Sequence, residues 1–251
     1  QCGAAVCSPA CMTQNWQGHK HACRTKTKEN KTKEIHDQLK KDVLTTQKIE
    51  RIKQSLRTDT RSFIHNSTNE IVKDAINRVS EDGQTLLTDQ IYSTNTHIAK
   101  LLIQHRADVN KVIVTGESPL YLATNYKQAG TVSALLEAKA NVNQKMNYGA
   151  TPWSKATSLM LAAQNGDQKI VETLLKARAD VNQVRSDRAT SLMLAVQNGH
   201  EQAFKSLLKA KADVNQVSPG GFSSLLAAAQ NGHEQAIKSL LKAKADVNQV
   251  S

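Results

Sequence analysis

A four-residue string, A-D/N-V-N, recurs five times in the 251-residue chain and constrains its fold more than any other feature. The intervals between successive copies are 33, 39, 33 and 33 residues, and the copies begin at Ala107, Ala140, Ala179, Ala212 and Ala245. A period in this range is typical of a solenoid, in which each unit buries its apolar face only against its neighbours. The sequence therefore predicts a stack of repeats over residues 81–251.

Each repeat carries the signals that begin and end a short first helix. A Ser or Thr side chain can accept hydrogen bonds from the free N–H groups at a helix start, and the candidates are Thr85, Ser118, Thr157, Thr190 and Ser223. Glycine can adopt the left-handed conformation that ends a helix, and Asn-Gly pairs stand at 165–166, 198–199 and 231–232. The first helices should therefore be short.

A second, amphipathic helix is predicted after each turn. In the fourth repeat Phe204, Leu207 and Leu208 have helical spacing, and in the fifth Ile237, Leu240 and Leu241 repeat it. We expect all four leucines to be buried between neighbouring helix pairs. His200 and His233 share one repeat position, directly after Asn-Gly, which indicates a structural role.

These motifs resemble the ankyrin repeat, with five repeats at 81–114, 115–146, 147–184, 185–217 and 218–251. The resemblance implies an all-α repeat fold, an ankyrin solenoid with finger loops, and no catalytic activity of its own. The family's T-P-L-H is replaced, for example by S-P-L-Y at 118–121, so its histidine is missing. Six extra residues in the third repeat offer two helix starts, Thr151 and Thr157. Spacing favours Thr157 and leaves Trp153 in a finger loop.

The ankyrin resemblance also implies where a protein partner binds. Its members present the finger loops and the outer side of the first helices on a concave face. The lysines of the second helices, such as Lys205, Lys209 and Lys238, should lie on the opposite side. The corresponding partner-binding positions are Gln84, Tyr92, Glu117, Asn125, Tyr126, Gln164, Asn165, Gln197, Asn198, Phe222, Gln230 and Asn231. Aromatic residues tend to dominate interface energies, and the Gln-Asn pairs could equally be inherited repeat sequence before the glycine.

All four cysteines lie within the first 23 residues, spaced C-x4-C-x3-C-x7-H-x3-C. They could form two disulfides, but thiolates with an imidazole also suit tetrahedral zinc, either in one site (Cys7, Cys11, His19 and Cys23) or in two. The segment CSPACMTQNWQGHKHAC resembles the end of a MYND zinc finger. That family binds two zinc ions, which implies the ligands Cys2, Cys7, Cys11, His19 and Cys23.

The MYND resemblance pairs Cys7 with Cys11 on one ion, and Cys2 with His19 and Cys23 on the other. Fingers of this family bind short proline-containing peptides, and Trp16 matches the tryptophan of their groove. We expect the remaining zinc ligands to precede Gln1 and the repeat array to continue beyond Ser251, since that chain end lacks a polar capping repeat.

A basic connector, residues 24–66, joins the partial finger (1–23) to a predicted capping helix at 67–80. The whole chain has a formal net charge of +11. Residues 20–61 hold 13 Lys and Arg against 6 Asp and Glu, which keeps a nucleic-acid-associated regulator as an alternative function. Few aromatic side chains accompany these lysines, so single-strand binding is not favoured.

Sequence motifs of nucleotide binding, nucleophilic hydrolysis and metalloprotease catalysis are missing from the chain. No apolar run is long enough for a membrane helix. We therefore expect a non-enzymatic protein-interaction scaffold in the cytoplasm or nucleus. A regulatory fragment of a larger enzyme is a further alternative.

Overall fold

The computed structural model of the chain describes residues 76–80, 83–147, 149, 151 and 154–248. The chain divides into two units, residues 1–60 and 61–251, and the described residues all belong to the second. The finger, the connector and residues 67–75 of the predicted capping helix lie outside the described residues.

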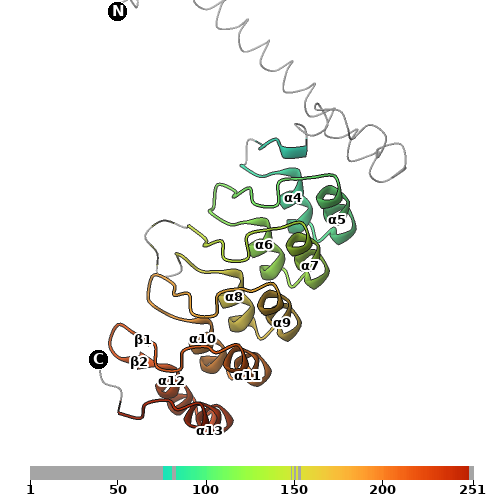
Figure 1. Ribbon diagram of the computed structural model, residues 1–251. Helices are drawn as coiled ribbons and strands as arrows, with labels where there is room; N and C mark the ends of the chain where they lie inside the picture. The colour runs from blue at the N-terminus through green and yellow to red at the C-terminus, as the bar shows by residue number, and fades with distance from the viewer. Residues whose placement is uncertain (1–75, 81–82, 148, 150, 152–153, 249–251) are drawn as a thin grey trace, which may run out of the picture. The chain divides into compact units, whose positions relative to one another are not determined.

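Ten helices, in five antiparallel pairs, make up the described part of the chain (Figure 1). The first helices of the pairs are α4 (Leu86–Tyr92), α6 (Pro119–Asn125), α8 (Ser158–Asn165), α10 (Ser191–Gln197) and α12 (Ser224–Gln230). The second helices are α5 (Thr96–Gln104), α7 (Ala129–Glu137), α9 (Gln168–Lys176), α11 (Glu201–Lys209) and α13 (Glu234–Lys242).

The predicted helix starts are confirmed. Every first helix is capped by a hydroxyl that accepts a backbone N–H three residues later, from Thr85, Ser118, Thr157, Thr190 and Ser223. In the third repeat the helix begins after Thr157 rather than at Thr151, as spacing predicted. Local cap chemistry was therefore sufficient to find these helices.

The helices form two layers. Each first helix contacts the first helix of the next repeat, and each second helix does the same, so the pairs follow one another in chain order (Figure 1). Gly166 ends α8 with a φ of 70°, a left-handed conformation that suits glycine. Lys127 holds the same position in the second repeat, with a φ of 54°.

The A-D/N-V-N string forms a ladder along the turns between repeats. The Asp or Asn at its second position accepts the backbone N–H two residues later, as Asp213 does from Asn215. The final Asn accepts a backbone N–H of the following repeat, and Asn182 receives that of Asp213 at 2.8 Å. Asn77 does the same for Asp108 at 2.7 Å, so this pattern begins before residue 81. The string thus recurs because it joins each repeat to the next.

Two histidines add a second link between repeats, in keeping with the structural role predicted for them. The Nε2 of His200 donates to the carbonyl oxygen of Gln164 at 2.9 Å, and that of His233 lies 3.4 Å from the carbonyl oxygen of Gln197. Both imidazoles therefore contact the end of the preceding first helix.

Burial of the predicted leucines is only partly as expected. Leu207 and Leu240 are completely buried, but Leu208 is half-buried and Leu241 is 45% exposed. The prediction for Leu241 was wrong because the side of α13 on which it lies has no further helix against it in the described part of the chain. Helical spacing identified the apolar face and could not say how much of it a neighbour covers.

The fold is also not purely helical. Strands β1 (Val217–Ser218) and β2 (Phe222–Ser223) pair antiparallel around the Pro-Gly-Gly turn of the last finger loop. Earlier loops close with a single backbone hydrogen bond at the same place, such as Ile113 N to Glu117 O at 3.0 Å. The six extra residues extend the third loop beyond the equivalent bond between Met146 N and Ala156 O, and Trp153 lies outside the described residues.

Candidate functional site

The residues predicted to bind a partner fall into two groups on the surface formed by the first helices and the bases of the finger loops. We call this surface the first-helix face. Tyr92, Glu117 and Tyr126 come together at the first two repeats. Gln164, Gln197, Asn198 and Phe222 line one groove at the last three. Residues far apart in sequence are thus brought together by the stacking of repeats.

The first group is built around two tyrosines from neighbouring repeats. Tyr92 is the last residue of α4, and Tyr126 caps the end of α6. Their ring centroids are 5.4 Å apart with an interplanar angle of 60°, an edge-to-face arrangement that aromatic pairs favour. Tyr126 remains 36% exposed, so a partner can reach it.

Glu117 lies beside the tyrosine pair at the base of the second finger loop. Its Oε2 accepts the hydroxyl of Thr115 at 2.7 Å, and its carboxylate lies close to the Tyr92 phenol. Burial raises the pKa of Tyr92, and the negative charge of Glu117 and the proximity of Tyr126 raise it further. At neutral pH the phenol is therefore protonated. We call Tyr92, Tyr126, Glu117 and Thr115 the tyrosine cluster.

Tyr121, which the sequence analysis missed, lies between the two groups. It packs with Met146 against a buried apolar cluster of Ala156, Met160 and Leu194. Burial and the charge of Glu117 raise the pKa of Tyr121, while the charge of Arg185 lowers it. Its position in the family's T-P-L-H motif could have drawn attention to it.

The second group lines a groove of about 440 Å³ between the last three repeats. Its lining mixes amide, apolar and charged side chains. The residues that line the groove are Gln164, Arg185, Asp187, Ala189, Met193, Leu194, Gln197, Asn198, Ser218, Pro219 and Phe222.

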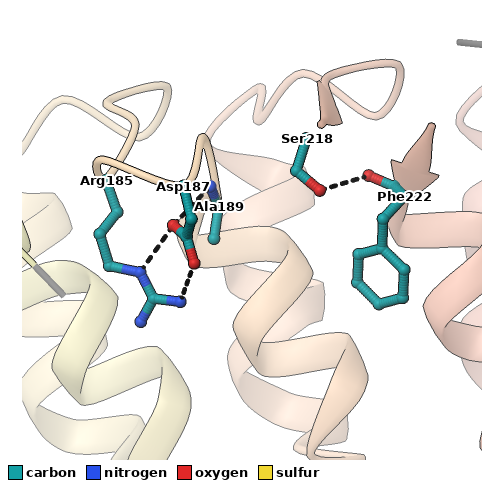
Figure 2. Close-up of polar contacts among 5 residues, drawn as sticks. All are labelled: Arg185, Asp187, Ala189, Ser218 and Phe222. Atoms are coloured by element: carbon teal, nitrogen blue, oxygen red, sulfur yellow. Dashed lines mark hydrogen bonds and ion pairs between the residues drawn. The ribbon is translucent and has the colours of Figure 1, made fainter. Parts of the chain in front are cut away.

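Arg185 and Asp187, also missed by the sequence analysis, form an ion pair in the fourth finger loop (Figure 2). The Arg185 Nε donates to Asp187 Oδ1 at 2.8 Å and its Nη2 donates to Oδ2 at 2.5 Å, and the Ala189 N–H donates to Oδ1 at 3.1 Å. Burial opposes ionisation of Asp187, but these hydrogen bonds and the guanidinium charge outweigh it and lower its pKa. The groove therefore contains a charge pair that is neutralised within one loop.

Phe222 is held at the groove by the β1–β2 hairpin. The Ser218 hydroxyl donates to the Phe222 carbonyl oxygen at 3.2 Å across this turn. Figure 2 shows Arg185 and the ring of Phe222 extending from successive loops in the same direction, toward the helices. The loops thus present a cation bound to its own carboxylate and an aromatic ring along one side of the groove.

The amide residues divide by what their side chains bind. The Asn198 and Asn231 Nδ2 groups each donate to the carbonyl oxygen four residues earlier, at 2.8 Å, and so help to end their own helices. Gln164 and Gln197 present side chains to the groove. Neither group includes the remaining predicted positions, which are Gln84, Asn125, Asn165, Gln230 and Asn231.

The predicted zinc ligands Cys2, Cys7, Cys11, His19 and Cys23, together with Trp16, lie outside the described residues. Within residues 76–80, 83–147 and 154–248, no group of three or more His, Cys, Asp or Glu side chains gathers as a metal site would require. In the same part of the chain, each helix is too short or too polar to cross a membrane.

Comparison with known proteins identifies the repeats. A family model described as ankyrin repeats (3 copies) matches residues 61–146 and 159–251, which is most of the chain. No curated protein matches the chain.

Proposed function

The chain belongs to the ankyrin-repeat family, and from this premise we propose that it is a non-enzymatic adaptor that binds a protein partner on the first-helix face. Ankyrin repeats generally mediate protein–protein interaction. More specifically, we propose that the partner contacts both the groove of the last three repeats and the tyrosine cluster.

The observation that carries this proposal is the groove of the last three repeats. The half-buried Phe222 provides apolar contact, while Gln164 and Gln197 provide amide donors and acceptors beside it. Aromatic anchors surrounded by polar groups that can hydrogen-bond are characteristic of protein interfaces. The internal pairing of Arg185 with Asp187 leaves the groove without net charge, which suits an uncharged polypeptide segment.

The test is a pull-down with purified protein as bait, followed by calorimetry with the captured partner. Phe222→Ala and Tyr126→Ala should each weaken binding about 30-fold or more, the loss typical of truncating an interface hot spot. Lys238→Ala is the matched control, because Lys238 is an exposed residue of a second helix, 3.7 Å from Glu234. It should change affinity by less than about threefold.

The opposite result would contradict the proposal. If only Lys238→Ala abolished binding, the first-helix face would not be the interface. A steep fall of affinity with salt would instead favour the nucleic-acid alternative through the basic segment 20–61, because phosphate contacts release counterions. An interface of apolar and amide groups should depend on salt only weakly.

We further propose that the N-terminal segment is a MYND-like finger that binds zinc through Cys2, Cys7, Cys11, His19 and Cys23. The support is sequence alone: four thiols and one imidazole form a donor set that zinc prefers, and Trp16 falls in register with them. The family's proline-containing peptides are the ligands that Trp16 would contact.

Mass spectrometry under non-reducing conditions tests the zinc proposal. All four cysteines should be alkylated as free thiols after zinc is removed by a chelator, and zinc should be released stoichiometrically with loss of thiol protection. Two disulfides would overturn it.

A further inference from the structure

The two carboxylates of the first-helix face, those of Asp187 and Glu117, differ in the groups that donate hydrogen bonds to them. Asp187 is bound by the guanidinium of Arg185. Glu117 accepts the Thr115 hydroxyl and lies close to the Tyr92 phenol, and within the described residues no ion pair includes it. A hydroxyl donor satisfies a lone pair without bringing a compensating charge. A carboxylate has about four lone-pair sites, and the Thr115 hydroxyl leaves room for further donors.

The tyrosines place aromatic surface beside this charge. In an edge-to-face pair the edge of one ring covers a single face of the other, so most of the ring surface in the Tyr92–Tyr126 pair is not used by the pair itself. Tyr126 is the more accessible ring, at 36% exposure. An aromatic face attracts a cation through its quadrupole, most strongly when the cation is partly desolvated.

Two cations of the described repeats have carboxylate partners of their own. Lys127 directly follows Tyr126, but its Nζ lies 3.8 Å from Asp167 Oδ1 in the next repeat. Arg185, whose charge reaches Tyr121, is held by Asp187 in the fourth loop. The cluster thus combines an uncompensated carboxylate with an accessible aromatic ring.

We propose that the tyrosine cluster binds an arginine side chain of the partner, with the guanidinium against Tyr126 and its N–H groups donating to Glu117. This inference rests on the proposed protein-binding function and names the chemistry of one contact. Arginine is preferred over lysine because its planar guanidinium can stack on a ring while it donates to a carboxylate, whereas an ammonium is a compact and strongly hydrated charge.

The probe is the peptide acetyl-Gly-Arg-Gly-amide, titrated into isotope-labelled protein and followed by NMR. Its matched control contains citrulline, which has the shape of arginine and no charge. The arginine peptide should shift resonances of Tyr92, Glu117 and Tyr126 in a saturable way, and the citrulline peptide should bind at least fivefold more weakly. A lysine peptide should lie between them.

Variants separate the two parts of the contact. Glu117→Gln should weaken the arginine peptide at least fivefold while leaving the citrulline peptide unchanged, and Tyr126→Leu should weaken it similarly. Tyr126→Phe keeps the aromatic face and should retain binding. Glu137→Gln, on the exposed end of α7, is the matched charge control and should have no effect. Thermal unfolding of each variant checks that it is folded.

Two results would overturn the inference. Equal binding of the arginine and citrulline peptides would exclude a charge-specific site, and unchanged binding in Glu117→Gln would exclude this carboxylate. Either result could be obtained while Phe222→Ala still abolished binding of the captured protein partner. In that case the arginine site would be excluded and the proposed function would stand. If Phe222→Ala and Tyr126→Ala also left partner binding intact, both proposals would fall.

Discussion

Residues 198–217 and 231–250 have the same sequence except at Phe204 and Ile237, yet they are not in the same environment. The helices they form have the same length, and both are followed by an alanine cap. Leu207 and Leu240 are equally and completely buried, whereas Leu208 is half-buried and Leu241 is 45% exposed. Val247 is 66% exposed, while its counterpart Val214 is half-buried.

The difference shows which contacts a repeat makes with each neighbour. Side chains that are buried in both copies are covered by their own repeat and the one before it. Side chains that differ are covered in the fourth repeat by the fifth. Because a solenoid is stabilised by intrinsic and nearest-neighbour terms, paired substitutions in the two copies can measure these terms separately.

The largest effects are expected from Leu207→Ala and Leu240→Ala. Substitution of a fully buried leucine by alanine costs about 2–5 kcal/mol of the free energy of unfolding. Both leucines are completely buried, which predicts similar losses at the two positions. Urea titration measures the two values. A loss at Leu240 less than half that at Leu207 would show that the last helix pair frays.

Gly199→Ala should be more destabilising than Gly232→Ala. Both glycines have a positive φ, of 70° and 68°, so alanine at either position is strained by about 1–2 kcal/mol. At Gly199 the new Cβ would also lie 2.8 Å from His233 Cε1, and at Gly232 it would meet no atom within 4 Å. His233 must then move and lose its contact with Gln197, which adds about 0.5–1.5 kcal/mol.

The double variant Gly199→Ala, His233→Ala provides the control for this pair. Without the imidazole, the additional loss at Gly199 should disappear and the two glycine positions should become equivalent. A difference that persisted in urea titration would show that the imidazole contact is not its cause.

A smaller contrast is expected between Leu208→Ala and Leu241→Ala. The half-buried Leu208 should lose less than about 2 kcal/mol, and the exposed Leu241 should stay within about 0.5 kcal/mol of the unmodified protein. Equal losses, measured by the shift of the urea midpoint at constant slope, would mean that Leu241 is covered in solution.

The smallest effect should be the same in both copies. Lys211 and Lys244 have a positive φ, of 64° and 65°, at the end of the second helix. Glycine there removes steric strain, while its greater unfolded-state entropy and the loss of a charge near the helix end offset part of the gain. We expect both Lys211→Gly and Lys244→Gly to raise the free energy of unfolding by about 0.5 kcal/mol. Unequal gains in the free energy of unfolding, measured by the same titration, would show that the neighbouring repeat affects this position.

The sequence assigned each predicted partner-binding residue to a position in its repeat, and it carried no information on the distances between residues of different repeats. Tyr92, Glu117 and Tyr126 were each expected on the partner-binding side, but their contact depends on how far one repeat is displaced from the next. Arg185 and Asp187 were missed because they stand in a loop where the repeats differ, so periodicity carries no signal there. Asn198 was expected to face a partner. It lines the groove, and its amide also donates to a backbone carbonyl at the end of its own helix.

The sequence by itself determined the number and order of the helix pairs in 81–248, their starts and the turns between them. Caps, glycine positions and apolar spacing act within a few residues, so they can be recognised along the chain. Only the tertiary structure decided how much of each leucine pair is covered, and that Glu117 lies close to Tyr92, whose ring packs against Tyr126. These features arise between residues 25 or more positions apart, or depend on the presence of a neighbouring repeat, and stacking geometry alone sets such distances.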